Sequence, residues 1–152
     1  MEKKLFIGID FSKSKFDVSV TEDIDTKDHK QTVFENTKTG YEDFLKWLSQ
    51  QSKIKRSSWL FCGEHTGLYS RGLADFLVKK HLLIWLENPL QIKHCSGIKR
   101  AKTDSIDARC IAQYACRYVD KAKAYKPMSR EINDLRLLSS YRSRLVKNKV
   151  SL

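Results

Sequence analysis

The chain has 152 residues and a formal net charge of +11, with 41% hydrophobic and 31% charged residues. This length allows one domain with a substantial hydrophobic core and is too short for two full domains. The longest apolar run, residues 82–86, is far shorter than the roughly 20 residues of a membrane-spanning helix, which excludes such a helix. Because the first residues show no signal-peptide core, we expect a cytoplasmic protein.

The positive charge is concentrated in the second part of the sequence. Residues 1–50 have 8 basic and 10 acidic side chains, whereas residues 51–152 have 21 basic and 8 acidic ones. Such an uneven excess favours a polyanionic partner, with nucleic acid as the first candidate and a merely soluble basic surface as the alternative. The four cysteines form no CxxC pair, so we expect free thiols rather than a zinc site.

Hydrophobic patterning predicts three strands at the start of the chain. Residues 4–10 (KLFIGID) are typical of a buried strand that ends in an acid. Residues 16–21 (FDVSVT) alternate between apolar and polar side chains and follow a short polar link, as in a hairpin. We expect a third strand at residues 30–34 and a turn at residues 36–40.

Helices and strands alternate in the rest of the sequence. Tyr41, Phe44, Leu45 and Leu48 recur at helical spacing and predict one apolar helix face. The predicted elements are, in order, a helix at 41–50, a strand at 57–62, a helix at 68–80, a strand at 82–86, a short helix opening at 88–89, a basic loop at 97–102, a helix from 103 to about 118, and a long helix at 129–152 with Ser129 as its N-cap.

This order of elements predicts an α/β fold of the ribonuclease-H-like (RuvC-like) type. The first three strands can pair as an antiparallel meander, and the two later strands, each reached through a helix, should run parallel. The result is a mixed five-stranded sheet with flanking helices. We assign residues 1–126 to this domain and residues 127–152 to the start of a helical, coiled-coil-like linker.

The last predicted helix carries an apolar seam. Its members, at alternating spacings of three and four residues, are Leu138, Tyr141, Leu145, Asn148 and Leu152. A partner helix, as in a homo-oligomer, and packing on the chain's own domain are equally compatible with this seam. Because the helix has no stop signal, we expect the natural chain to continue.

Two acids end predicted strands. Asp10 follows the first strand, and Glu64 follows the strand at 57–62; if these strands are neighbours, both acids lie at one sheet edge, where α/β folds place their ligands. A fold best tolerates two close carboxylates when a cation lies between them. The alternative for each residue is a simple turn acid.

Asp104 and Asp107 begin the helix after the basic loop, and their spacing places both on one helix face. Acids in a first turn also stabilise a helix through its dipole, which is the structural alternative. Together with Asp10 and Glu64 they suit two divalent cations about 4 Å apart for attack at phosphorus. Hard carboxylate ligands favour Mg²⁺ or Mn²⁺.

Four segments resemble the DEDD insertion-sequence transposases and the related Piv-type DNA invertases. These segments are residues 8–20 (GIDFSKSKFDVSV), 64–69 (EHTGLY), 86–93 (LENPLQIK) and 102–108 (KTDSIDA). The resemblance covers nearly the whole chain. It implies that Asp10, Glu64, Asp104 and Asp107 occupy the four acidic positions of a RuvC-like site.

The resemblance also implies features beyond this chain. Members of the family carry a C-terminal domain with a nucleophilic serine, joined through a helical region, and are described as using an element-encoded guide RNA. We therefore expect the N-terminal catalytic domain of a DNA transposase or recombinase. The alternatives are a module that only binds guide RNA or DNA, and a RuvC-like junction-resolving nuclease.

Basic residues flank the acids and are candidates for contact with phosphates. They are Lys13 near Asp10, and Lys93, Lys99, Arg100 and Lys102 around the loop before Asp104. Such contacts would fix the position of a nucleic acid without reading its sequence. The alternative is a solvated basic loop.

Overall fold

The computed structural model describes residues 3–95 and 104–150, without the side chains of residues 95 and 104–106. Strands β1 (Leu5–Phe11), β2 (Lys15–Thr21), β3 (Lys30–Glu35), β4 (Trp59–Glu64) and β5 (Leu83–Glu87) form one sheet in the order β3-β2-β1-β4-β5. The pairs β1–β2 and β2–β3 are antiparallel, and β1–β4 and β4–β5 are parallel. The predicted mixed five-stranded sheet is therefore confirmed.

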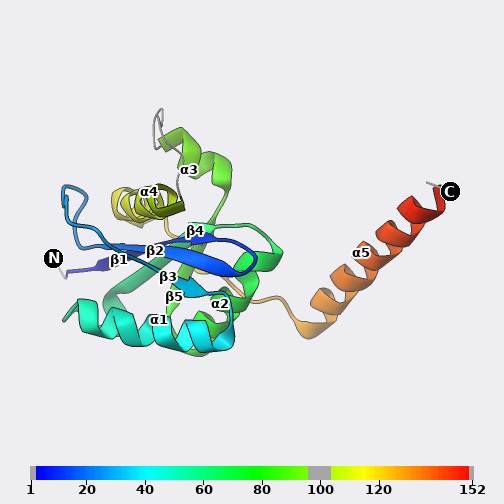
Figure 1. The fold of residues 1–152 in the computed structure, drawn as a ribbon, viewed down its shortest axis with the longest axis horizontal. Coiled ribbons are helices and arrows are strands. Elements are labelled where there is room, and N and C mark those ends of the chain that lie inside the picture. Colours follow the sequence, from blue (N-terminus) through cyan, green and yellow to red (C-terminus); the bar gives the residue numbers. More distant parts are fainter. Residues whose placement is uncertain (1–2, 96–103, 151–152) are drawn as a thin grey trace.

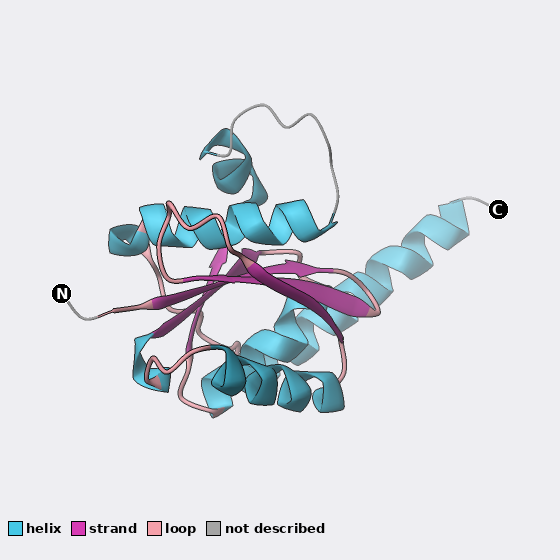
Figure 2. Ribbon diagram, turned by 60° about the vertical axis from the view of Figure 1, so that its left-hand side comes forward, coloured by secondary structure: helices cyan, strands magenta, loops and turns pink. Residues whose placement is uncertain are grey.

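Helices cover both faces of this sheet (Figures 1 and 2). Helices α1 (Lys38–Gln51) and α2 (Leu68–Lys79) lie on one face, and α4 (Asp104–Arg117) lies on the other, with α3 (Pro89–Cys95) beside it. Helix α5 (Arg130–Val150) projects away from the sheet. No helix in the described ranges is both long and apolar enough to cross a membrane.

Two elements begin at least two residues away from their predicted starts. The turn predicted at residues 36–40 was wrong in part, because α1 already begins at Lys38 and Thr37 caps it by accepting a hydrogen bond from the Gly40 N–H at 3.2 Å. The strand predicted from residue 57 begins at Trp59, since residues Arg56–Ser58 form a turn of 3₁₀ helix. Both segments are short and polar, so the sequence shows no apolar repeat that would indicate a helical turn there.

Each sheet face has its own core. Phe16, Phe44 and Phe61 belong to the larger core, which packs the sheet against α1 and α2. Cys62, Ile111 and other residues form the smaller core under α4. Alternation along the strands therefore divides the buried strand side chains between these two cores.

Helix α4 approaches β1 with almost no space between the two backbones. A Cβ atom on Gly8 would lie 2.2 Å from the Ala108 carbonyl oxygen and 2.3 Å from the Ala112 nitrogen, both of which are backbone atoms. Ala108 and Ala112 are themselves fully buried. The absence of a side chain at Gly8 and the small size of the two alanines thus fix the height of α4 above the strand.

We expect the Gly8→Ala substitution to destabilise the fold by about 2 kcal/mol or more, because neither backbone can yield without moving the helix. Urea denaturation followed by circular dichroism measures this change. Gln31→Ala, at an exposed position of β3, is the control and should change the free energy of unfolding by less than about 0.5 kcal/mol. Equal stability of the two variants would contradict the close approach.

Candidate functional site

Asp10 and Glu64 occupy neighbouring positions at the carboxyl edge of the sheet. Strands β1 and β4 run parallel with Ile9 opposite Gly63, so the next residues along the two strands are Asp10 and Glu64. Both are half-buried, and alternation places them on the α4 face of the sheet, the face to which Gly8 belongs. The geometry therefore brings together two acids that are 54 residues apart in the sequence.

Helix α4 carries the third acid to the same edge. Asp107 lies in the first turn of α4, directly before Ala108, whose carbonyl oxygen lies against Gly8. Because Gly8 precedes Asp10 by two residues on the same strand face, this contact holds the half-buried Asp107 near the end of β1. Asp104 begins the same helix, but its side chain lies outside the described residues.

The register extends the row of carboxylates by one residue on each side. Asp17 on β2 lies opposite Asp10 and is only 7% exposed, and Glu87 on β5 lies opposite Glu64. Four adjacent strands therefore each contribute one acid at the same level. The sequence analysis gave no role to Asp17 or Glu87, although Glu87 ends its strand just as Glu64 does.

Hydrogen bonds hold the Glu87 carboxylate. One oxygen, Oε1, accepts from the backbone N–H of Asn88 at 2.7 Å, and the other, Oε2, accepts from the Tyr114 hydroxyl at 3.1 Å. Tyr114 belongs to α4, is buried, and packs against the Trp85 ring with a centroid distance of 5.3 Å. This bond ties α4 to the edge strand β5, two turns along the helix from Asp107.

The electrostatic effect of the row reaches a buried thiol beneath it. Cys62 lies two residues before Glu64 on the same strand face and is fully buried. Burial, followed by the negative charges of Glu87 and Glu64, raises the pKa of this thiol well above its ordinary value. Cys62 is therefore an inert, protonated core residue, in agreement with the expectation of free thiols.

The carboxylates suit a divalent cation by their chemistry, since all are hard oxygen donors. Within residues 3–95 and the described part of 104–150, however, no three His, Cys, Asp or Glu side chains are grouped closely enough to hold a metal ion. The donor set thus fits Mg²⁺ or Mn²⁺, while the described side chains do not form a closed cage.

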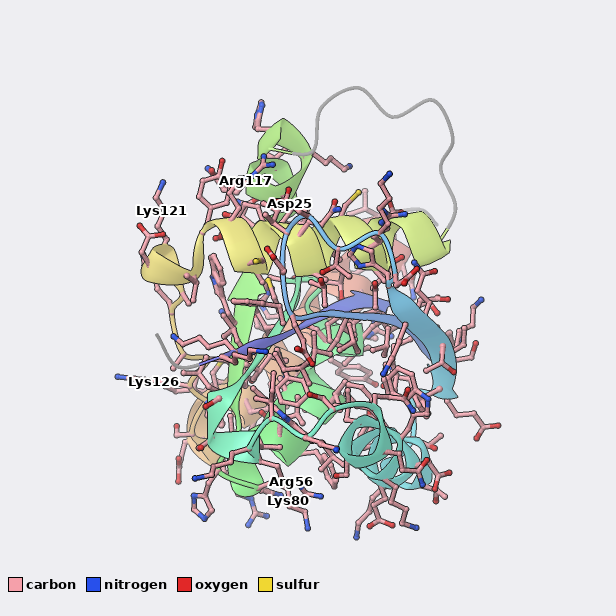
Figure 3. All side chains as sticks on the ribbon, turned by 90° about the vertical axis from the view of Figure 1, so that its left-hand side faces the viewer. Asp25, Arg56, Lys80, Arg117, Lys121 and Lys126 are labelled. Atoms are coloured by element: carbon pink, nitrogen blue, oxygen red, sulfur yellow. The ribbon has the colours of Figure 1, made fainter. Side chains whose placement is uncertain are left out.

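Two of the predicted basic residues lie within the described part of the chain. Lys13 is exposed in the turn between β1 and β2, and Lys93 is exposed in the last turn of α3. Lys99, Arg100 and Lys102 lie outside the described residues. Three other basic residues lie away from these acids (Figure 3). Arg56 and Lys80 lie on the α1/α2 side of the sheet, and Lys121 lies on the α4 side.

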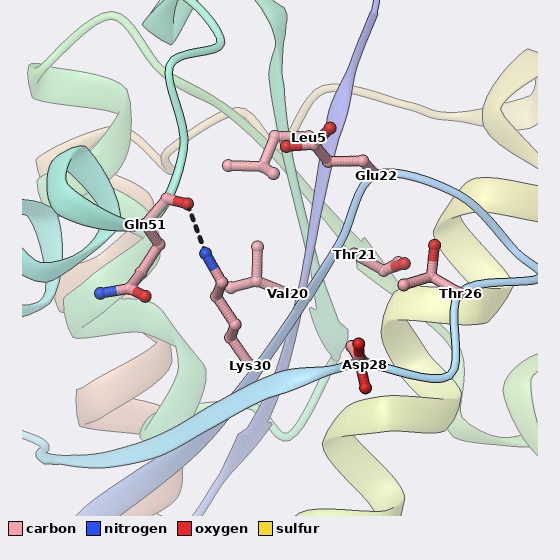
Figure 4. A pocket seen from close by; sticks show the side chains of 8 residues that line it. All are labelled: Leu5, Val20, Thr21, Glu22, Thr26, Asp28, Lys30 and Gln51. Atoms are coloured by element: carbon pink, nitrogen blue, oxygen red, sulfur yellow. Dashed lines mark hydrogen bonds between the residues drawn. The ribbon is translucent and has the colours of Figure 1, made fainter.

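A separate cavity of about 210 Å³ lies at the opposite end of β1 (Figure 4). Leu5, the first residue of that strand, and Val20 line it, and the Lys30 ammonium donates a hydrogen bond of 2.7 Å to the Gln51 carbonyl oxygen there. Because Asp10 and Glu64 lie at the carboxyl ends of their strands, this cavity has no part in the carboxylate edge.

Comparisons with known proteins identify the family of the chain and its fold. Residues 7–152 match the model of a family described as transposase, of the DEDD type of IS110 elements. The structure resembles Thermus thermophilus RuvC in complex with a Holliday junction substrate, with a TM-score of 0.55 and 11% identity over 80% of this chain and 99% of that one. A second Thermus thermophilus RuvC structure gives a TM-score of 0.54, 12% identity and the same coverage. No curated protein gives a significant match.

We expect Tyr114→Phe to lower the free energy of unfolding by about 1–2 kcal/mol, because the substitution removes a hydrogen bond to the charged Glu87 and keeps the packing. Thermal or urea denaturation measures the loss. Tyr69→Phe is the matched control, since the Tyr69 side chain is 40% exposed. If the two variants lost the same stability, the tie between α4 and β5 would carry no energy.

Proposed function

This chain belongs to the DEDD transposase family of IS110 elements, and from this premise we propose that it is the catalytic domain for divalent-metal-dependent phosphoryl transfer on DNA during transposition. The observation that carries the proposal is the β1–β4 register, which sets Asp10 beside Glu64 at the sheet edge to which α4 brings its first turn. Asp10, Glu64, Asp104 and Asp107 are the proposed metal ligands, and DNA is the proposed substrate.

The proposed ligands differ in how rigidly the fold holds them. Asp10 extends from the central strand of the sheet, where it pairs with Asp17 on β2 and directly follows Ile9, which pairs with β4, so its position is rigid. Glu64 ends β4 and has the longer side chain, which can adjust. Asp107 and Asp104 move only as the first turn of α4 moves, and Gly8 limits that motion.

Two bound Mg²⁺ or Mn²⁺ ions would neutralise charge at the scissile phosphate and activate the attacking oxygen. Since the described carboxylates do not form a closed cage, we expect that metal and nucleic acid together draw them inward. The protein residues then hold the phosphate in line for attack, and the exposed Lys13 and Lys93, with Lys99, Arg100 and Lys102, contact neighbouring phosphates.

Two alternatives use the same surface. The RuvC likeness makes a junction-resolving nuclease the second candidate, and the basic charge after residue 50 is compatible with a module that binds guide RNA or DNA without catalysis. A nuclease would cleave a Holliday junction that lacks any transposon end, and a pure binding module would need none of the four acids.

We expect Asp10→Asn and Glu64→Gln each to weaken Mn²⁺ binding at least about tenfold, because each removes one anionic ligand from a shared site. Isothermal titration calorimetry of the chain, with and without a short DNA duplex, measures this. Asp43→Asn, at an exposed position of α1, is the matched control and should bind Mn²⁺ as the wild type does. Unchanged Mn²⁺ binding by Asp10→Asn in the presence of DNA would refute the metal site.

The proposed quaternary contact is through α5. No described residue of this helix is buried, and the seam residues Leu138, Tyr141 and Leu145 are 64%, 60% and 51% exposed. Packing of the seam on the chain's own domain is therefore not what the structure has. We propose that residues 127–152 begin a linker that pairs with the same helix of a second copy.

Leu138→Asp combined with Leu145→Asp should convert the oligomer to a monomer, because pairing would bury two charges on each of the two helices. Size-exclusion chromatography with light scattering gives the mass. Tryptophan fluorescence should stay unchanged, since Trp47, Trp59 and Trp85 lie in α1, β4 and β5 and α5 does not pack on the sheet. Ser143→Asp, on the opposite side of the helix, is the control and should leave the mass unaltered. A wild-type monomer at high concentration would contradict the pairing.

A further inference from the structure

A small cavity of about 30 Å³ lies beside the turn that follows Glu64. Its wall includes three basic side chains, His65, Arg71 and Arg136, together with Gly67 and Tyr125. No acidic side chain among the described residues lines it. The cavity has room for a small group such as the non-bridging oxygens of a phosphate and is too small for a base.

Three segments that are far apart in the sequence build this cavity. The His65 N–H donates to the Glu87 carbonyl oxygen at 2.8 Å, which fixes the turn after β4 against β5. The Tyr125 N–H donates to the Ile84 carbonyl oxygen at 2.8 Å and so brings the segment before α5 alongside β5.

The guanidinium of Arg71 completes this arrangement. It donates a hydrogen bond of 2.5 Å to the Asn133 side-chain oxygen and so joins α2 to the first turn of α5. The same helix supplies Arg136, whose side chain is exposed and can turn toward a ligand in the cavity. The two guanidinium groups and the His65 ring therefore converge on the cavity although each comes from a different element.

The backbone of the turn is open toward the cavity. Gly67, the N-cap of α2, has a φ of +69°, and a Cβ atom built on it would meet nothing within 4 Å. No side chain caps the first turn of this helix, so its N–H groups add partial positive charge.

The acid next to this cavity is already engaged. Asp75, one turn after Arg71 on α2, accepts a hydrogen bond of 2.9 Å from the Tyr125 hydroxyl. Burial, and then this bond, raises the pKa of Tyr125 to about 12, in keeping with a neutral hydroxyl that donates to Asp75. The excess of positive charge at the cavity wall therefore remains after Asp75 is counted.

We propose that this cavity binds a backbone phosphate of the nucleic-acid strand, adjacent to the phosphate on which the carboxylates act. The inference rests on the proposed function, because it takes the Asp10–Glu64 edge as the place of reaction. His65 directly follows Glu64, and the cavity lies on the α2 side of the sheet, so a strand that crosses the sheet edge from the α4 face reaches the cavity next. Arg71 and Arg136 supply the charged hydrogen bonds, and the first turn of α2 supplies the backbone dipole.

The test measures the Kd of the 152-residue chain for a fluorescent DNA duplex of about 30 base pairs. Fluorescence anisotropy gives this Kd at KCl concentrations from about 50 to 200 mM. Arg71→Gln and Arg136→Gln should each reduce the slope of log Kd against log salt by about 0.9, and raise Kd about eightfold at 0.1 M salt, because each abolishes one phosphate contact. Arg71→Lys retains the charge and should retain the slope, which separates loss of a contact from loss of structure. Arg142→Gln, on another face of α5, is the control.

The outcomes separate this inference from the proposed function. If the wild type binds the duplex and Arg71→Gln and Arg136→Gln keep its slope, or if Arg142→Gln reduces the slope as much as they do, the phosphate site is wrong and the proposed function stands. If the wild type does not bind DNA at any salt concentration, both are overturned. Loss of slope in the two variants alone supports the site.

Discussion

The packing of α4 on β1 at Gly8 is the constraint on which the rest of the structure depends. Two backbones meet there without an intervening side chain, and Ala108 and Ala112 leave no room for adjustment. A helix held at this height carries Asp107 to the end of β1, and the bond from Tyr114 to Glu87 fixes the rotation of the same helix over β5. The Gly8 packing and this hydrogen bond together set the position of the α4 acids relative to those of the sheet.

A row of carboxylates across four strands is unfavourable by itself, because like charges at neighbouring positions repel. The structure reduces this cost at Glu87, both of whose oxygens accept hydrogen bonds. It also keeps the neighbouring Cys62 thiol protonated through burial. The other acids leave a concentration of negative charge at this sheet edge, which favours the binding of cations. This negative edge belongs to a chain whose total charge is strongly positive.

The two faces of the sheet differ in the size of their cores and in the position of the acids. The face under α1 and α2 holds the larger, aromatic-rich core and so supplies most of the apolar burial. The α4 face has a smaller core and carries the acids at its edge. The exposed α5 adds little to either core, although its first turn reaches α2 through Arg71 and Asn133. Stability and chemistry are thus separated by the alternation of side chains along each strand.

The sequence by itself determined the elements, their order and the mixed sheet, because these depend on local hydrophobic periodicity and on short connections. It also predicted Asp10 and Glu64 as strand-end acids and an apolar seam on the last helix, whereas only the tertiary structure shows that this seam is exposed. Only the tertiary structure decided that Asp17 and Glu87 lie in the same row, since register joins residues from separate strands. The same holds for the convergence of His65, Arg71 and Arg136, because no local pattern relates side chains that long-range packing brings together.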